Sequence, residues 1–565
     1  IVKIMPLEVG RESIFCLDFT RKKQGDFIPY EATIPELIYR KCSSECIAII
    51  FDSEKLALTF GKVKSETEQL AAGLLSSGLQ LNDRILICGY NHSQVLLSAL
   101  GAARAGLVFS LTSPNFSRPE QLKRLLELGQ FRAVVLFSPT GESDKTYNLI
   151  LEVCPELKRS MCGHTKSAAL PKLTHVILAD EDHKHAGTFT LSEIYAKSSK
   201  ERIEKLPNYA QWNSHKLAAI QFTMGSTGPP KAVGLTHYQL INGCRIAANT
   251  IGIQKETVLS CALPMFRIPV FCLVAFTPFL VESRCVFPEP SPLPRFLFNS
   301  INKYKCTNLL SNAAALRLLL KMALAQKIVL PSVNTVILLG ERVSAELLVS
   351  IERVMRNAKH IAVGMLSTEI GSVPVLSDNT TNLVKAVGKP LDGYQVDVVP
   401  MDKLRKTSNG HRVGELRLKP LVKTKFIGYG PKFSDYSEWI NTGDVVSIGN
   451  DGNIEIITHK DDLVYDRYDK LVEHWRSERL LAQHDDIRGV QVVQICPGAP
   501  VVAVIVPKSL KSVQFSKSDL SIFCRDNNVY VPDQFAVVND FPRVNTKIQK
   551  YKLREMIRSK AIVPH

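Results

Sequence analysis

The sequence lacks the features that mark membrane-spanning, disulfide-rich and disordered proteins. Its longest apolar run, Ile268 to Val281, is interrupted by Pro278 and is shorter than the roughly 20 residues of a membrane helix. The 13 cysteines are odd in number and scattered, without the second close pair that would complete a zinc site. This pattern favours a reducing compartment. Hydrophobic residues at 45% and charged residues at 22% exclude disordered and fibrous classes.

Long basic runs and recognisable nucleic-acid modules are also missing, although the formal net charge is +16 and the pI is about 9.2. Scattered Lys and Arg suit anionic small molecules such as ATP, carboxylates or coenzyme A, and a merely solubilising charge explains them equally well. We therefore expect no nucleic-acid partner and no transmembrane segment. The chain begins at Ile1 rather than methionine, which leaves an upstream targeting peptide open. Nothing in the sequence decides the oligomeric state.

Short β-branched runs alternate with helical patterns along the first part of the chain. A run at 84–88 precedes a helical pattern at 93–105, and further runs follow at 133–137 and 175–178. This alternation predicts an α/β fold. At 565 residues the chain exceeds what one hydrophobic core serves, so two or more domains are expected.

The segment 221–237 changes abruptly from apolar residues to hydroxyl and glycine residues that end in a lysine. A triphosphate needs hydroxyl donors, unshielded backbone N–H groups and a cation. The residues that supply these groups are Thr223, Ser226 and Thr227, then Gly225 and Gly228, and finally Lys231. Ala232 directly after the lysine excludes the common P-loop, which has a hydroxyl residue there. Taken alone, a solvated turn explains the segment about as well.

A second turn follows the expected strand 335–339, at Gly340 and Glu341. Ligands of open α/β sheets lie beyond the carboxyl ends of strands. Gly340 and the loop 223–231 are therefore expected to form walls of one nucleotide pocket. Beyond a turn at 450–453 and a strand at 454–457, the composition becomes polar. A small terminal domain could start here, but from the residues alone an ordinary surface loop is the favoured interpretation.

Several separated motifs, in the same order, resemble those of adenylate-forming acyl-CoA synthetases, the AMP-binding enzymes, with medium-chain acyl-CoA ligases the most similar. The motifs are 221–237, 364–370, 387–390, 414–416, 439–444 and 547–555. The resemblance spans nearly the whole chain. It implies a large multi-layered N-terminal domain at 1–457, a hinge at 458–461 that pivots at Asp461, and a smaller mobile α+β C-terminal domain at 462–565.

The resemblance implies a reaction in two steps. The family transfers AMP from ATP to a carboxylic acid, releasing pyrophosphate, and then passes the acyl group to coenzyme A. We therefore expect the protein to use ATP, Mg²⁺ and coenzyme A, and to act in fatty-acid metabolism. A mitochondrial matrix location is suggested by the relatives, with the cytoplasm as the alternative.

Residue roles follow only where the motifs match. Lys547 would bridge the substrate carboxylate and the α-phosphate, Thr368 would hydrogen-bond phosphate, and Glu369 would help hold Mg²⁺. These three are the expected catalytic residues. The expected ATP contacts are Thr223, Gly225, Ser226, Thr227, Gly228, Lys231, Gly340, Glu341, Met365, Asp444 and His459, with Asp444 on the ribose hydroxyls.

The chain also departs from the family pattern. His459 replaces an arginine, Arg267 replaces a histidine near the acyl tunnel, Met365 replaces an aromatic residue, and 466–470 replaces a glycine-rich loop. Three hypotheses stay open. The first is a working acyl-CoA ligase, the second an adenylating enzyme with another acceptor, and the third a catalytically inactive binding or scaffold protein.

Overall fold

A computed structural model describes residues 28–40, 42–180, 185–223, 228–291, 293–341, 343–401, 411–508, 516–544 and 547–565, with only the backbone of Val544 and Lys547. Gly225, Ser226 and Thr227 of the predicted phosphate loop lie outside these residues. In the described part of the chain, no helix combines the length and the apolar character needed to cross a membrane.

The first large sheet has seven strands in the order β7-β6-β5-β3-β4-β8-β9 and is parallel except at the β9 edge. Its strands are β3 (Arg84–Cys88), β4 (Val108–Thr112), β5 (Ala133–Leu136), β6 (His175–Leu178), β7 (Thr188–Thr190), β8 (Leu217–Phe222) and β9 (Ala232–Thr236). The expected strands at 84–88, 133–137 and 175–178 match β3, β5 and β6. Their apolar residues are buried because helices cover parallel sheets on both faces.

The second large sheet has nine strands in the order β16-β15-β14-β13-β12-β10-β11-β1-β2. They are β1 (Ile47–Phe51), β2 (Leu56–Thr59), β10 (Val258–Cys261), β11 (Arg284–Phe287), β12 (Asn308–Ser311), β13 (Thr335–Leu339), β14 (His360–Ser367), β15 (Ser372–Leu376) and β16 (Lys389–Pro390). A four-stranded antiparallel sheet follows, formed by β17 (Gln395–Pro400), β18 (Arg412–Lys419), β19 (Ile440–Ile448) and β20 (Ile454–His459).

The main hydrophobic cluster joins both large sheets through helices between them. Within it, α9 (Ile268–Val281) is apolar on all sides and almost entirely buried, so the longest apolar run of the chain is a core helix. The other helices of this part are α1 (Ile34–Ile38), α2 (Phe60–Ser76), α3 (Ser93–Arg104), α4 (Pro119–Gly129), α5 (Ser143–Val153), α6 (Leu191–Ala196), α7 (Lys200–Glu204), α8 (His237–Ile251), α10 (Pro294–Tyr304), α11 (Ala313–Ala325) and α12 (Ala345–Val354), with 3₁₀ turns at Pro155–Arg159, Tyr209–Gln211 and Lys460–Asp462.

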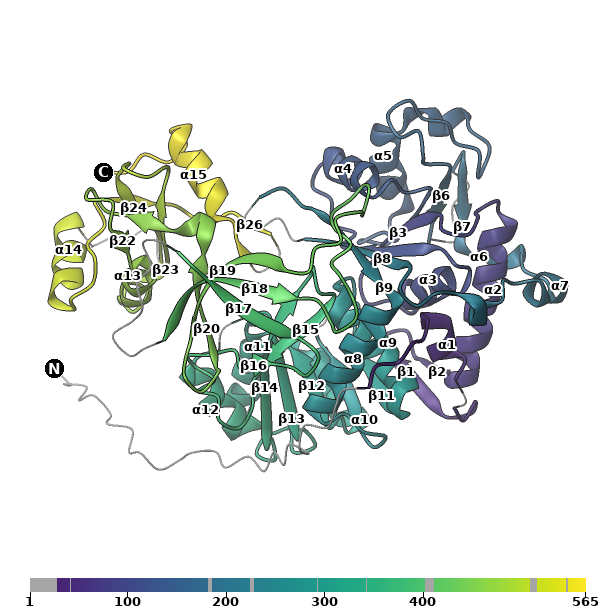
Figure 1. Ribbon diagram of the computed structural model, residues 1–565, viewed down its shortest axis with the longest axis horizontal. Helices are drawn as coiled ribbons and strands as arrows, with labels where there is room; N and C mark the ends of the chain where they lie inside the picture. The colour runs from purple at the N-terminus through teal and green to yellow at the C-terminus, as the bar shows by residue number, and fades with distance from the viewer. Residues whose placement is uncertain are drawn as a thin grey trace.

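The C-terminal elements form a smaller lobe at one end of the molecule's long axis (Figure 1). Within this lobe, α15 and β26 lie on the side that faces the rest of the chain. Its two hydrophobic clusters contain only residues from Val464 onward. Its elements are β21 (Val464–Tyr465), β22 (Leu471–Val472), α13 (His474–Leu481), β23 (Ile487–Gln494), β24 (Val501–Pro507), α14 (Lys517–Asp526), β25 (Gln534–Val537), β26 (Arg543–Val544), β27 (Lys547–Ile548) and α15 (Lys550–Arg558). The predicted α/β fold with a large N-terminal and a smaller C-terminal domain is confirmed.

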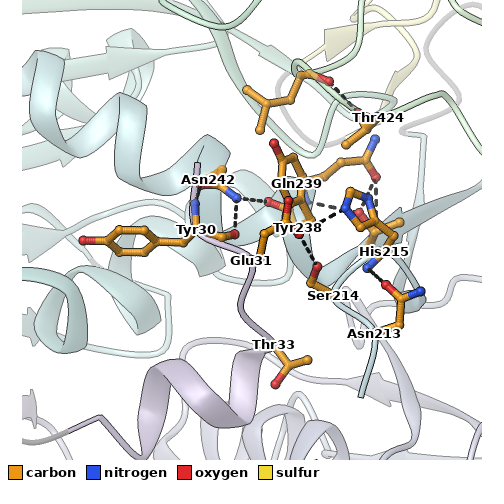
Figure 2. A network of polar contacts seen from close by, with 12 residues as sticks. Tyr30, Glu31, Thr33, Asn213, Ser214, His215, Tyr238, Gln239, Asn242 and Thr424 are labelled. Atoms are coloured by element: carbon orange, nitrogen blue, oxygen red, sulfur yellow. Dashed lines mark hydrogen bonds and ion pairs between the residues drawn. The ribbon is translucent and has the colours of Figure 1, made fainter. Parts of the chain in front are cut away.

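The first described residues are fixed to α8 by a polar network (Figure 2). The backbone N–H of Tyr30 donates to Asn242 Oδ1 at 2.7 Å, and Asn242 Nδ2 donates to the Tyr30 carbonyl at 2.9 Å. The Glu31 carboxylate accepts from Ser214 Oγ at 2.9 Å. The His215 ring stacks on Tyr238, with ring centroids 4.6 Å apart. These contacts fix α8, which begins directly after the strand that returns from the predicted phosphate loop.

Candidate nucleotide and acid site

A cavity of about 800 Å³ opens between the two large sheets, the β19–β20 pair and the C-terminal tail. Thr223 and Gly228 reach it from the ends of the predicted phosphate loop, and Gly340 reaches it from the end of β13. The described residues Thr223 and Gly228 of the loop therefore share one cavity with Gly340, although β8 and β13 belong to different sheets. Of the other predicted residues, Met365, Thr368, Glu369, Asp444 and His459 also line it.

The two ends of the predicted phosphate loop are joined at its base. The Thr223 N–H donates to the Lys231 carbonyl at 2.9 Å, and the Lys231 N–H donates to Thr223 Oγ1 at 2.9 Å. Lys231 itself does not line the cavity, and its ammonium lies 4.9 Å from the centroid of the Tyr429 ring. Its predicted contact with ATP remains a prediction.

Thr368 and Glu369 lie at the tip of the tight turn between β14 and β15. The Gly371 N–H donates to the carbonyls of Ser367 and Thr368 at 3.0 and 3.1 Å, and Gly371 adopts φ +69°. The turn places both side chains at the carboxyl end of β14, on the cavity.

Tyr429 links the phosphate loop to the predicted metal ligand. Its hydroxyl donates to Glu369 Oε1 at 3.3 Å, and the Lys231 ammonium lies over its ring. Burial, together with the Glu369 carboxylate, raises the pKa of Tyr429, so the hydroxyl stays a donor. Sequence reasoning missed Tyr429, because sixty residues separate it from Glu369 and no motif marks it.

The described residues contain no cluster of three or more His, Cys, Asp or Glu side chains that could hold a metal ion. Mg²⁺ is commonly held by one or two carboxylates together with substrate phosphates and water. The Glu369 carboxylate on the cavity fits that mode of binding and does not fit a dedicated all-protein metal cage.

Asp444 and His459 are cross-strand partners on β19 and β20. The Asp444 N–H donates to Thr442 Oγ1 at 3.0 Å, and His459 Nδ1 accepts from the Asp461 N–H at 3.3 Å. Gly443 has φ +79°, and a Cβ there would lie 2.3 Å from His459 Nε2. Only glycine fits at this point, so the His459 ring can lie against the backbone that carries Asp444.

The nucleotide wall is the name we use for Gly340, Thr368, Glu369, Asp444 and His459. Glu341 is not part of this wall, since it does not line the cavity. Its Oε2 accepts from the Ala314 N–H at 3.1 Å, at the first turn of α11. The predicted contact between Glu341 and ATP thus remains a prediction.

The C-terminal tail reaches the same cavity. Lys547 lies in β27, which pairs with β26 so that Val544 and Lys547 are opposite each other. Four other residues of the tail line the cavity, namely Arg543, Gln549, Tyr551 and Lys552. Thr223 and Gly228, on either side of the loop's undescribed residues, thus share one cavity with the tail, although more than three hundred residues separate the two segments.

Two ion pairs tie the tail helix α15 to its own lobe. Arg554 Nη1 lies 2.9 Å from Asp462 Oδ1, and Lys550 Nζ lies 2.7 Å from Glu478 Oε1. All four side chains are largely buried. Asp462 is next to Asp461, the predicted pivot, whose side chain is half exposed.

The acid wall of the cavity, as we define it, consists of Gln221, Phe266, Arg267 and Leu366. The backbone N–H of Ile268 donates to Gln221 Oε1 at 2.8 Å, which positions the start of α9 and with it Arg267. Arg267 Nε is buried without an acceptor. The segment 466–470 lies elsewhere, in a turn where Asp466 Oδ1 accepts from the N–H groups of Tyr468 and Lys470, and none of its residues lines the cavity.

Comparisons with known proteins agree with this geometry. The family model for AMP-binding enzymes matches residues 40–420. The chain is 26% identical over 540 residues to the mitochondrial medium-chain acyl-CoA ligase ACSF2 of Rattus norvegicus, covering 90% of this chain and 85% of that protein. The human protein of the same name is also 26% identical, over 531 residues, with the same coverage.

Solved structures show the same fold at low sequence identity. The anthranilate CoA ligase AuaEII in complex with anthranoyl-AMP has a TM-score of 0.75 at 18% identity, covering 94% of this chain and 99% of that one. ATP-bound MatB from Rhodopseudomonas palustris has the same TM-score and identity and is covered completely.

Proposed function

This chain belongs to the AMP-binding enzyme family, as an acid–thiol ligase of the acyl-CoA synthetase type, and we propose that it converts a medium-chain carboxylic acid into its coenzyme A thioester. In the first step a carboxylate oxygen of the acid attacks the α-phosphorus of ATP, and pyrophosphate leaves. In the second step the thiol of coenzyme A attacks the acyl carbon, and AMP leaves. The observation that carries the proposal is the cavity in which the ends of the phosphate loop, the nucleotide wall and the tail meet.

The nucleotide wall supplies groups for each part of ATP. Thr368 provides a hydroxyl donor for phosphate, and Asp444 accepts from the ribose hydroxyls. Met365 is buried beside the cavity and offers an apolar surface to the adenine ring. The loop 223–231, of which Thr223, Gly228 and Pro230 line the cavity, contributes backbone and hydroxyl donors to the phosphates.

The attack brings an anionic carboxylate toward an anionic phosphate, so positive charge and oriented donors must lower the barrier. We assign to Lys547 the bridge between the substrate carboxylate and the α-phosphate, because its strand adjoins tail residues that line the cavity. Glu369 would hold Mg²⁺, which when bound to ATP neutralises charge on the phosphates. Tyr429 orients the Glu369 carboxylate by donating to it.

The second step requires the tail to leave the cavity and admit the pantetheine arm. We propose that the lobe from residue 462 turns on the hinge 458–461, with Asp461 as the pivot. Two observations support this. The lobe has hydrophobic clusters of its own, and the polar connector Lys460–Asp462 is a 3₁₀ turn in which no residue is fully buried.

The medium chain length and a mitochondrial matrix location are part of the same proposal. Both rest on the names of relatives at 25–26% identity. Fractionation of the source cells against matrix and cytoplasmic markers tests the location, with the cytoplasm as the alternative.

One assay tests the reaction. The protein is given ATP, Mg²⁺, coenzyme A and a panel of carboxylic acids, and pyrophosphate and thioester are measured separately. We expect both products, and we expect Lys547→Ala to lower both by about 10³-fold, since it removes one charged group aimed at the transition state. Lys560→Ala, an exposed lysine of the same tail, is the matched control.

The outcomes separate the three hypotheses. Pyrophosphate without thioester would mean another acceptor, consistent with the non-glycine turn at 466–470. Neither product in the wild type, or equal products in the wild type and Lys547→Ala, would reject the catalytic role.

A further inference from the structure

Arg267 is the charged residue of the acid wall, and its environment differs from that of an ordinary structural arginine. It immediately precedes α9, at a point where Phe266 and Leu366 make the wall apolar. No hydrogen bond or ion pair to its side-chain nitrogens is recorded from the described residues, and Nε is fully buried. A guanidinium has five N–H donors and remains charged at neutral pH.

Among the described residues, no acidic side chain forms an ion pair with Arg267. Glu341 is the acidic residue whose charge acts on Arg267, but no ion pair joins the two side chains, and the Glu341 carboxylate is held by the start of α11. Burial lowers the pKa of the Arg267 guanidinium, and Glu341 opposes this only as the smaller effect. A partly buried guanidinium without a hydrogen-bonded partner is unfavourable. A ligand that pairs with Arg267 would therefore bind more tightly than one that does not.

The shape of the donor group indicates what that ligand would be. The planar fork of a guanidinium matches a carboxylate through two parallel hydrogen bonds. A neutral hydroxyl or keto group would leave most of the charge uncompensated. The reacting carboxylate of the substrate is assigned to Lys547 and ATP, so Arg267 would need a second one.

We propose that the acid substrate of this enzyme is a dicarboxylic acid, with the second carboxylate paired with Arg267. This inference rests on the proposed function and narrows its substrate class. It also accounts for an arginine next to apolar residues, because the methylene chain of the diacid would contact Phe266 and Leu366 while its far end contacts the guanidinium. Arg267 is thus a specificity-determining residue.

The test compares acids that differ only in the second carboxylate. Hexanoate and octanoate are measured against hexanedioate and octanedioate, using pyrophosphate release, with wild type, Arg267→Met, Arg267→Lys and the control Arg317→Met. Arg317 is exposed on α11 and does not line the cavity. Because Met keeps an unbranched side chain as far as the position of Nε and removes an unpaired charge, we expect the Met variant to fold.

We expect kcat/KM of the wild type to be about 10-fold or more higher for each diacid than for its monoacid. Arg267→Met should lower kcat/KM for the diacids by about 100-fold, because the second carboxylate then lacks its charged partner. The monoacids and the KM for ATP should change by less than about 3-fold, within the small effects of neutral contacts. Arg267→Lys should retain part of the preference, because it keeps the charge and loses the fork. Hexanedioate should also raise the Tm of wild type and leave that of Arg267→Met unchanged.

Three results would overturn the proposal. Activation of monoacids with no diacid preference would leave the ligase function standing and reject the second carboxylate. An equal loss for both acid series in Arg267→Met, with a raised KM for ATP, would place Arg267 on the nucleotide instead. Absence of pyrophosphate with every acid would reject the proposed function itself, and the diacid inference with it.

Discussion

Two polar side chains of the nucleotide wall, Glu369 and His459, are held by hydrogen bonds from other residues, whereas the charged group of the acid wall is not. Glu369 accepts from Tyr429, and His459 accepts from the backbone of Asp461. Arg267, in contrast, has a buried Nε with no acceptor. Side chains that the protein already holds in position suit a ligand that does not vary between substrates, such as ATP. A wall with an unpaired charge leaves the remaining partner to the substrate, so it sets which acid is used.

The largest expected effect is on the nucleotide wall. Glu369→Gln keeps the size of the side chain and removes the charge proposed to hold Mg²⁺, so we expect pyrophosphate release to fall by about 10³-fold. The loss should be equal for monoacids and diacids, because the two walls act on different parts of the reaction. Initial rates at increasing Mg²⁺ concentration measure it, and the variant should need more Mg²⁺.

Glu346→Gln, an exposed position on α12, is the control for that change. A change in acid preference in Glu369→Gln would contradict the separation of the two walls.

A smaller effect is expected at Gly443. Gly443→Ala places a Cβ 2.3 Å from His459 Nε2, so the ring must move away from the wall. We expect the KM for ATP to rise by about 10-fold, as for a displaced positioning group. Gly498→Ala is a matched control, since Gly498 also has positive φ, at +83°, but has open space around it. Both variants should lose about 1–2 kcal/mol of stability from the left-handed backbone, measured by urea unfolding.

Comparison of the two glycine variants distinguishes the effect of backbone strain from the effect of the contact with His459. If Gly498→Ala raised the KM for ATP as much as Gly443→Ala does, the contact with His459 would not be the cause.

The smallest effect is expected from Gln221 on the acid wall. Gln221→Met leaves the Ile268 N–H without its acceptor and should lower the free energy of unfolding by about 1–2 kcal/mol. Because the start of α9 carries Arg267, the ratio of diacid to monoacid activity should fall by about 5-fold, in the range of an indirect positioning effect. The KM for ATP should not change. Gln94→Met, which removes an acceptor from Tyr195 far from the cavity, is the control, and an altered KM for ATP in Gln221→Met would show that the walls are coupled.

Local sequence patterns predicted the buried parallel strands well. The runs at 84–88, 175–178 and 335–339 match strands residue for residue, because continuous β-branched and apolar residues are typical of strands covered on both faces. Their order in the sheets was not predictable. β1 pairs with β11, more than two hundred residues away, and no local pattern encodes such a pairing.

Some site residues were predicted and others were missed, because contacts between distant parts of the chain leave no local sequence pattern. Motif order placed Thr223, Gly340, Thr368 and Asp444 at one pocket, and the structure brings them to one cavity. Tyr429 contacts both Lys231 and Glu369, and these residues are far apart in the sequence and share no motif. The sequence also marked Arg267 as unusual, yet its missing acceptor depends on Glu341 being held by α11, which only the fold reveals.

The ion pair between Arg554 and Asp462 has a consequence for how the enzyme alternates between its two steps. It fastens the tail helix to the residue that directly follows the proposed pivot, and Lys550 fastens the same helix to α13. A rotation of the lobe at Asp461 would therefore move α15, and the Lys547 strand that directly precedes it, together with the rest of the lobe. If the lobe turns at Asp461 as proposed, withdrawal of the Lys547 strand and arrival of the opposite face of the lobe would be one event, so the thiol of coenzyme A would meet the acyl adenylate only after Lys547 had left the cavity.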